Sequence, residues 1–345
     1  MNKEVASIIF DEYHSIDKYS NIKYTVYGER QCHTDISVMI PTYKRRNLLV
    51  KAVQSVLRQK TKYVMEIVIV DNNPDTDQDD IADFLSKNND SRIIYVRNND
   101  NIGMFGNWNR CIELSHGNWL VILSDDDELE DDYIETMMSY ATGIKDCKAL
   151  CCRHHLIDDN DDIIKRKEIH CNQSKVIPIS MNDMYILHPV DIMGCLLNRS
   201  EAMRVGGFNE AFFPCSDNVF LLHICAENGL YLNTNKAIRY RWAVNESIKP
   251  SVRIDFAKFH IQKSSEINKI FGLHGRIIHR FIVNAKCDYE FFPLIREKII
   301  DQETNNSLRT ELGLDKKYSP FRRFFYRIIS RFYAHRIYCR KNVLG

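Results

Sequence analysis

Residues 36–57 read ISVMIPTYKRRNLLVKAVQSVL, and this stretch decides the fold. It opens on a short apolar run that Pro41 stops, which is typical of a buried strand ending in a loop. After the loop, apolar residues recur at helical spacing at Leu48, Leu49, Ala52, Val53, Val56 and Leu57. The stretch therefore predicts a strand, a loop and an amphipathic helix, in that order.

The same alternation continues along the chain. Apolar runs at residues 67–70, 93–96 and 119–123 predict three more strands, and residues 81–85 and 104–114 predict helices between them. A repeated strand–helix order gives a mostly parallel sheet with helices on both faces. We therefore predict an α/β fold, a Rossmann-like sheet flanked by helices.

Polar residues follow each predicted strand at its carboxyl end. In chain order they are Pro41-Thr42-Tyr43, Asp71-Asn72-Asn73, Asn101-Ile102-Gly103 and Ser124-Asp125-Asp126-Asp127. In open parallel sheets ligands bind where the carboxyl ends of the strands and their loops converge. We therefore expect these residues to form one polar, acidic rim that holds the binding site.

The acidic triplet (Asp125, Asp126 and Asp127) is the most informative part of this rim. Adjacent carboxylates repel one another unless a cation offsets their charge. Mg²⁺ and Mn²⁺ take such oxygen ligands, and they commonly bind one or two carboxylates plus substrate phosphates. The alternative is a solvated turn at a helix start near Glu130. The position after a buried strand favours metal binding.

Asp71 could accept a hydrogen bond from a base or ribose, or could simply start a turn.

Composition limits the class of protein. The chain has 345 residues, of which 44% are hydrophobic and 27% charged, enough for one large domain or two modest ones. No stretch has the roughly 18 apolar residues of a membrane-spanning helix, and the N-terminus lacks a signal-peptide layout, so we expect a cytoplasmic protein. The eleven cysteines are then expected to be free thiols. A zinc site at Cys147, Cys151, Cys152, His154 and His155 is less favoured than a strand there.

The rim segments, together with Asn107 and Gly117-Asn118-Trp119, resemble family 2 glycosyltransferases of the GT-A fold over about residues 35–250. The resemblance implies that Pro41, Thr42 and Tyr43 line the nucleotide base and that Asp71 hydrogen-bonds it. It places Asn101 and Asp125 on the nucleotide side as well. The triplet corresponds to the family's DxD region with Ser124 at its first position. Asp127 is then the first metal ligand, and Asp126 lies near the ribose or the metal.

A second part of the resemblance carries the chemistry. Val205-Gly206-Gly207-Phe208-Asn209-Glu210 is similar to the family's Gly-Gly-Phe-Asp-Glu stretch, and Ser216-Asp217 stands where the family shows Glu-Asp. Asp217 therefore matches the catalytic base. An acceptor hydroxyl is a poor nucleophile until a carboxylate takes its proton, and a metal can offset the charge of the leaving diphosphate. Asp217 could instead, or also, cap a helix at residues 219–226.

Tyr240-Arg241 and Asn245-Glu246-Ser247 resemble the family's Tyr-Arg-x-His stretch, a mobile segment that can close over the diphosphate. Ala243 replaces the histidine. Arg241 is thus a candidate phosphate or lid residue, and an inward-facing salt bridge is the equally weighted alternative.

The C-terminal region differs from the rest in charge. Residues 316–341 hold nine Lys or Arg and no Asp or Glu, and apolar residues from Phe321 to Tyr333 follow helical spacing after Pro320. A basic helix with an aromatic face is typical of one that lies on an anionic membrane. The alternative is that the aromatic face packs on the protein's own core. Nucleic-acid binding is the least favoured, because the body of the chain is mildly acidic.

The predicted organisation is an N-terminal extension at 1–34, a GT-A domain at 35–250 and a helical region at 251–345. The predicted function is an inverting glycosyltransferase that uses Mn²⁺ or Mg²⁺ and a nucleotide-diphosphate sugar, with UDP first. Its acceptor would be a glycan or lipid-linked glycan of a surface polysaccharide, at the inner face of the cell membrane. A nucleotidyltransferase is an alternative, although the glycine-rich loop expected of it is missing. A non-catalytic sugar-nucleotide-binding scaffold is the other alternative.

Overall fold

The computed structural model describes residues 15–29, 32–75, 90–165, 174–242, 249–271, 276–315 and 317–344. The chain divides into two compact units. A helical unit contains α6 (Met181–Ile186) and the helices from α9 onward, and a sheet unit contains all the other described elements. The division after Val244 lies close to the predicted boundary at residue 250. However, α6 belongs to the helical unit although it lies within the 35–250 stretch.

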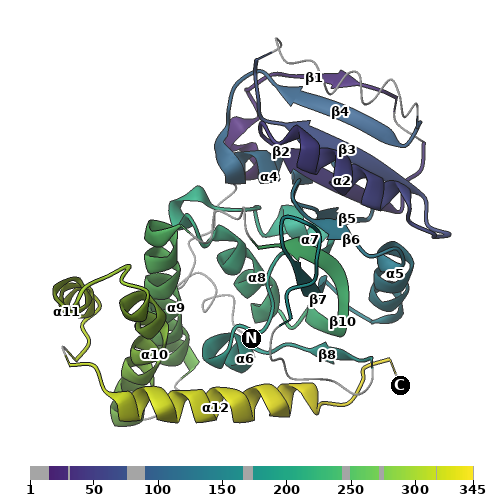
Figure 1. Ribbon diagram of the computed structural model, residues 1–345. Coiled ribbons are helices and arrows are strands. Elements are labelled where there is room, and N and C mark those ends of the chain that lie inside the picture. The colour runs from purple at the N-terminus through teal and green to yellow at the C-terminus, as the bar shows by residue number, and fades with distance from the viewer. Residues whose placement is uncertain are drawn as a thin grey trace. The chain divides into compact units, whose positions relative to one another are not determined.

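A ten-stranded sheet organises the sheet unit (Figure 1). Its strands are β1 (Tyr24–Tyr27), β2 (Ile36–Thr42), β3 (Met65–Asp71), β4 (Ile93–Asn98), β5 (Trp119–Ile122), β6 (Glu128–Leu129), β7 (Ala149–Ile157), β8 (Val176–Pro178), β9 (Leu196–Asn198) and β10 (Leu230–Arg241). Its helices are η1 (Ile16–Tyr19), α2 (Arg46–Leu57), α4 (Gly103–Leu114), α5 (Tyr133–Gly143), α7 (Arg199–Arg204), η2 (Glu210–Phe212) and α8 (Ser216–Ala226).

The strand order is β1-β4-β3-β2-β5-β9-β7-β10-β6, with β8 beside β10. The four strands predicted from apolar runs, β2 to β5, pair in parallel, as do β7 and β10, while β1, β6, β8 and β9 pair antiparallel. The prediction of a mostly parallel α/β sheet is confirmed, as are the strand over residues 149–156 and the helices that became α2 and α4. The helix predicted at residues 81–85 lies outside the described residues.

The connection order reverses at β2, because β3 and β4 lie on one side of it and β5 on the other. Such a switch point separates the loops that follow the two central strands and leaves room for a ligand between them. Here those loops begin at Thr42 and Leu123, so the rim predicted from sequence forms at this point.

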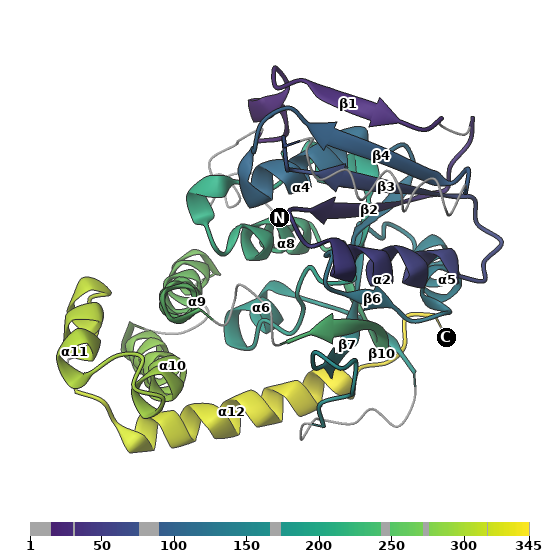
Figure 2. The same cartoon turned by 45° about the horizontal axis from the view of Figure 1, so that its top comes forward.

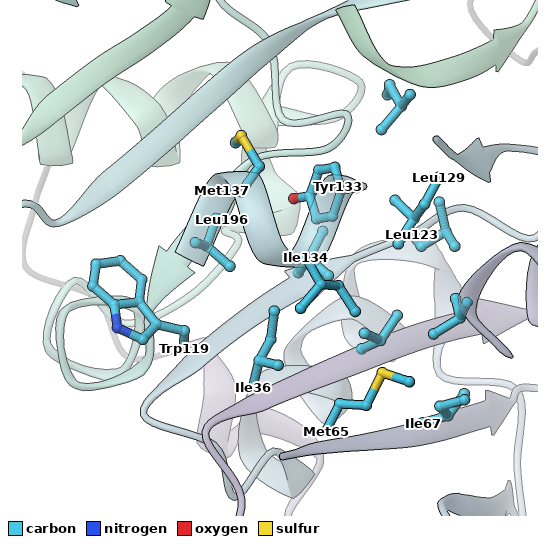
Figure 3. Close-up of a cluster of buried hydrophobic side chains, with 14 of the residues drawn as sticks. Ile36, Met65, Ile67, Trp119, Leu123, Leu129, Tyr133, Ile134, Met137 and Leu196 are labelled. Atoms are coloured by element: carbon cyan, nitrogen blue, oxygen red, sulfur yellow. The ribbon is translucent and has the colours of Figure 1, made fainter. Parts of the chain in front are cut away.

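The core lies on one face of these strands, against α2 and α5. Figure 3 shows Ile36, Ile67 and Trp119 of the strands and Tyr133 and Met137 of α5 within one cluster of buried side chains. The intervening strand residues, Met39 and Val68 among them, are also fully buried but lie outside this cluster. Strand side chains alternate between faces, so these residues cover the face on which α4 packs (Figure 2). Burial on both faces explains why the runs are continuously apolar.

In the helical unit, α9 (Pro250–Phe271), α10 (Arg276–Arg296), α11 (Gln302–Glu311) and α12 (Pro320–Tyr338) accompany α6. The fully buried Asp288 of α10 binds Arg309 of α11 at 2.5 Å and Arg322 of α12 at 2.7 Å. A buried carboxylate that holds two arginines ties the three helices together, and removing it would leave buried positive charge.

The predicted helix start at Pro320 is confirmed, and the Ser319 hydroxyl caps α12 by accepting from the Arg322 N–H. Among the described residues, no helix has both the length and the apolar character needed to cross a membrane.

Candidate active site

The acidic triplet follows β5 and is almost completely buried, with exposed fractions of 5%, 5% and 2% from Asp125 to Asp127. The Thr42 hydroxyl donates to Asp125 Oδ2 at 2.7 Å. Arg45 Nη1 lies 2.9 Å from Asp126 Oδ2 and 3.4 Å from Asp125 Oδ1. The loop after β2 is therefore bonded directly to the loop after β5, as expected at the switch point.

Asp127 is held from the other side. The backbone N–H of Arg241 donates to Asp127 Oδ1 at 2.9 Å, and no group in the described part of the chain donates a hydrogen bond to its second carboxylate oxygen. Burial, followed by the charge of Asp126, raises the pKa of Asp127 well above its usual value. Burial raises the pKa of Asp125 to about 6. Three carboxylates in so little water form a site of concentrated negative charge.

Asp71 ends β3 with both carboxylate oxygens engaged. Tyr95 donates its hydroxyl to Oδ2 at 2.6 Å, and the Asn73 N–H donates to Oδ1 at 2.9 Å. The second contact is the turn that the sequence left as an alternative. Burial raises the Asp71 pKa, whereas Tyr95, Asn73 and the nearby Arg97 lower it. Each carboxylate oxygen can accept more than one hydrogen bond, so these contacts leave capacity for a ligand.

Amide side chains fix the shape of the rim between β3 and α4. Asn101 Oδ1 accepts from Asn72 Nδ2 at 2.7 Å and from the Gly103 N–H at 2.9 Å. The Asn72 N–H donates to the carbonyl of Thr42 at 2.9 Å, which joins the ends of β2 and β3. Asn101 therefore shapes the start of α4. Pro41 is buried within β2, and Tyr43 just beyond it is 44% exposed.

Arg241 contacts the acidic triplet through both its backbone and its side chain. Its side chain is 1% exposed and donates to the carbonyls of Asp126 at 3.1 Å and Asp158 at 2.6 Å. It also pairs with Glu128 at 3.4 Å and with Asp161. These contacts keep the guanidinium within the protein, so they favour the salt-bridge interpretation over phosphate contact. The companion segment, Asn245-Glu246-Ser247 with Ala243, lies outside the described residues.

Asp217 lies in the first turn of α8 and is partly exposed. Its Oδ1 accepts from the Asn218 N–H at 2.8 Å and from Asn218 Nδ2 at 3.0 Å. Loss of water around the carboxylate raises its pKa to about 6, and the charge of Asp191 adds to the shift. A partly exposed carboxylate with this pKa is ionised at neutral pH but holds a proton more readily than a free Asp.

The segment from Asp191 to Met193 connects Asp217 with the triplet. Asp191 is near enough to Asp217 to raise its pKa. Two residues on, Met193 Sδ accepts a 3.5 Å hydrogen bond from the hydroxyl of Ser124, which directly precedes Asp125. One end of this segment thus bonds the residue before the acidic triplet, and the charge at its other end acts on Asp217.

Sequence reasoning missed several residues of this region. Arg45, Tyr95, Arg97 and Asp191 all contact or act on the residues named above. His154, considered from the sequence only as a zinc ligand, pairs with Asp191. Arg45 follows the Pro41-Thr42-Tyr43 segment closely, and Tyr95 and Arg97 alternate on the strand beside Asp71, so their positions could have drawn attention. Nothing in the sequence near Asp191 or His154 indicates their pairing.

The switch point and its acidic rim define the chain as a protein of the GT-A fold. The structure of S. aureus TarS residues 1–349 in complex with UDP-GlcNAc shares this fold. Its TM-score is 0.52 at 14% identity, and the match covers 89% of this chain and 93% of that one. Residues 37–206 match the model of Glycosyl transferase family 2.

Curated relatives agree with this assignment. GalNAc(5)-diNAcBac-PP-undecaprenol beta-1,3-glucosyltransferase of Campylobacter jejuni is 33% identical over 106 residues, which cover 31% of this chain and 34% of the relative. UDP-Glc:alpha-D-GlcNAc-diphosphoundecaprenol beta-1,3-glucosyltransferase WfaP of Escherichia coli is 34% identical over 92 residues, covering 27% and 35%. The matched stretch thus spans about a third of each of these relatives.

Proposed function

We propose that the protein is an inverting glycosyltransferase that moves a sugar from a nucleotide-diphosphate donor to an acceptor hydroxyl. The observation that carries the proposal is the bonded rim, in which Thr42, Arg45 and the acidic triplet meet at the switch point. The match of residues 37–206 to the family 2 model and the named activities of the relatives support it.

The acidic triplet fits a divalent cation. Burial raises the pKa values of Asp125 and Asp127, the neighbouring carboxylate of Asp126 adds to both shifts, and Asp127 keeps one oxygen without a hydrogen-bond donor from the described residues. Among those residues, no three His, Cys, Asp or Glu side chains are grouped as a complete metal cage. Mg²⁺ commonly uses only one or two carboxylates together with substrate phosphates. Asp126 and Asp127 would therefore hold Mg²⁺ or Mn²⁺, which when bound would offset charge on the departing diphosphate.

The remaining proposed roles are those that the family resemblance implies. Pro41, Thr42, Tyr43, Asp71 and Asn101 line the nucleotide side of the rim, with Asp125 between them and the cation site. Asp217 accepts the proton of the acceptor hydroxyl as that oxygen attacks the anomeric carbon. A single displacement of this kind inverts the configuration there. UDP is the proposed nucleotide, since the relative WfaP is named for a UDP-glucose donor.

The proposed acceptor is a lipid-linked glycan, as both relatives are named for diphosphate-linked undecaprenol substrates. The exposed face of α12 has the apolar character expected of a surface that contacts a membrane, where a lipid-linked substrate lies. Tyr326 and Ile337 are buried, at 3% and 0% exposed, whereas a series of apolar side chains on the other face is exposed. This series consists of Phe321 at 68%, Phe324 at 60%, Ile328 at 50% and Phe332 at 66%.

Arg327 and Arg331 lie exposed between these apolar residues. A helix whose open face combines aromatic rings with arginines binds the surface of an anionic bilayer, and each arginine adds about 1 kcal/mol. Since α12 already buries its other face, packing on the protein's own core does not account for the exposed rings. We therefore propose a peripheral location on the cytoplasmic face of the membrane.

Incubation with Mn²⁺ and a panel of nucleotide sugars tests the function. Slow donor hydrolysis and metal-dependent thermal stabilisation by one nucleotide support a transferase. Tight binding without hydrolysis or transfer to any acceptor would favour the non-catalytic scaffold, and pyrophosphorolysis of the donor would favour a nucleotidyltransferase.

A further inference from the structure

A carboxylate and an imidazole, Asp191 and His154, form a solvent-exposed pair in the sheet unit, and Met193, two residues after Asp191, bonds Ser124 next to the acidic triplet. Asp191 Oδ2 lies 3.9 Å from His154 Nδ1, and the two side chains are 44% and 28% exposed. The pair is thus reachable from solvent, yet Asp191 Oδ1 and His154 Nδ1 are both buried atoms with no hydrogen-bond partner in the described structure. Buried polar atoms are nearly always paired, so unpaired ones at an open site point to a missing ligand.

Two more such atoms flank the proposed base. Ser216 Oγ and Asn218 Oδ1 are buried without a partner, and they stand on either side of Asp217. Both residues are buried, at 0% and 6% exposed, so these two atoms are not open to a ligand from solvent.

Two aromatic side chains, Tyr240 and Trp242, form a row of rings with His154. His154 of β7 packs against Tyr240 of β10 with ring centroids 5.2 Å apart, and Trp242 follows at 6.4 Å from Tyr240. Trp242 is 37% exposed. Side chains alternate along a strand, which places Tyr240 and Trp242 on one face while Arg241 points to the acidic triplet on the other.

We propose that Asp191, His154 and Trp242 form a subsite for the acceptor sugar, a hexopyranose. Asp191 and His154 bind a ring hydroxyl next to the one that Asp217 deprotonates, and Trp242 covers the apolar face of the ring. A sugar hydroxyl both donates and accepts, so it can donate to the carboxylate and pair with the imidazole nitrogen. This inference rests on the proposed function, and it makes Asp191 a positioning residue that selects acceptors by one hydroxyl.

A binding experiment in the absence of sugar transfer tests the proposed subsite independently of the catalytic step. The probes are p-nitrophenyl β-glycosides of glucose, galactose, N-acetylglucosamine and N-acetylgalactosamine, followed by saturation-transfer NMR on the full chain. The wild type and Asp217→Asn should both give a signal from at least one glycoside. Asp191→Asn and Trp242→Ala should weaken that binding about tenfold, while Asp146→Asn, a change to an exposed carboxylate elsewhere in the sheet unit, should not.

Steady-state kinetics then distinguish an effect on acceptor binding from an effect on donor binding. Asp191→Asn should raise the acceptor KM about tenfold and leave the donor KM and acceptor-free donor hydrolysis within twofold, with partial rescue in Asp191→Glu. A raised donor KM would place the donor sugar at this pair and overturn the inference. So would unchanged glycoside binding in Asp191→Asn, or no binding of any glycoside by the wild type. If instead Asp217→Asn keeps full transfer activity, the proposed base fails while the subsite result stands.

Discussion

The backbone N–H of Arg241 binds Asp127 Oδ1 at 2.9 Å across a sequence separation of 114 residues. This bond fixes the last carboxylate of the acidic triplet to the end of β10. The register of β10 against β7 shifts twice between Asn233 and Ile238. Those irregularities set which backbone N–H reaches Asp127, so the geometry of the proposed metal ligand depends on a distant strand.

Replacing Asp127 by Ala should abolish metal-dependent binding of UDP. The variant loses the carboxylate oxygen that is open to a cation, and we expect kcat to fall about 100-fold or more. Thermal shift with UDP, with and without Mn²⁺, measures the first effect. Asp131→Asn, a change to an exposed carboxylate beyond the same loop, is the matched control. Equal UDP stabilisation of both variants by Mn²⁺ would argue against a cation at the triplet.

Transfer activity should fall as the pH drops through about 6. The pKa of Asp217 is raised to about 6, so the carboxylate is ionised above this pH and protonated below it. A protonated Asp217 cannot accept the acceptor proton. A profile of kcat/KM against pH should therefore show an acidic limb of unit slope near pH 6. A limb near pH 4, the range of an ordinary carboxylate, would contradict the assignment.

The same raised pKa predicts a stability change in Asp217→Asn. A carboxyl whose pKa is higher in the folded state than in the unfolded state destabilises the fold once it is ionised. The neutral amide removes that cost, so the melting temperature of the variant should exceed that of the wild type at pH 8 and match it near pH 4. A difference of equal size at both pH values would assign the gain to packing instead of charge.

Arg241 and Arg45 should respond differently to the same substitution. Arg241→Gln removes a buried guanidinium with several protein partners, and we expect a loss of about 3–5 kcal/mol in the free energy of unfolding. Arg45 is 34% exposed and faces Asp125 and Asp126, so Arg45→Gln should change stability little but alter nucleotide affinity. Urea unfolding and UDP titration distinguish the two. If Arg241→Gln keeps full stability and loses only UDP affinity, Arg241 is a phosphate ligand after all.

Replacing Phe321, Phe324 and Phe332 together by Ser should release the protein from membranes. The three rings are exposed, so the triple variant should keep its melting temperature while co-sedimentation with phosphatidylglycerol vesicles falls at least tenfold. Binding of the wild type should also weaken in high salt, because Arg327 and Arg331 contribute through charge. Equal binding to neutral and anionic vesicles, or to none, would contradict the proposed surface.

The parallel strands β2 to β5 were predictable because each is buried on both faces and therefore contains an unbroken apolar run. The short strands β1, β6 and β8 have two to four residues and no such run, so their positions depend on pairing with strands distant in sequence. The acidic triplet could likewise be located by its position after β5. The sequence also drew attention to Arg241, and Arg45 lies close to the Pro41-Thr42-Tyr43 segment, but their bonds to the triplet cross long stretches of chain and leave no local pattern.

The helix α12 illustrates the same limit. Helical spacing predicted its start and its aromatic character, but its apolar residues cover a wide arc of the helix. Only the structure separates buried Tyr326 and Ile337 from exposed Phe321 and Phe332. The pairing of Asp191 with His154 could not be predicted, because one residue lies in a loop and the other on a strand, and only the fold brings them together.

Sugar transfer by Asp217→Asn, measured with saturating donor and Mn²⁺, is the most direct test of how this protein works. The amide cannot take a proton but preserves the size of the side chain. We expect transfer to fall about 100-fold to 10,000-fold, with UDP affinity unchanged. A variant that transfers sugar within a few fold of the wild-type rate would show that another group activates the acceptor, and the role proposed for this carboxylate would be wrong.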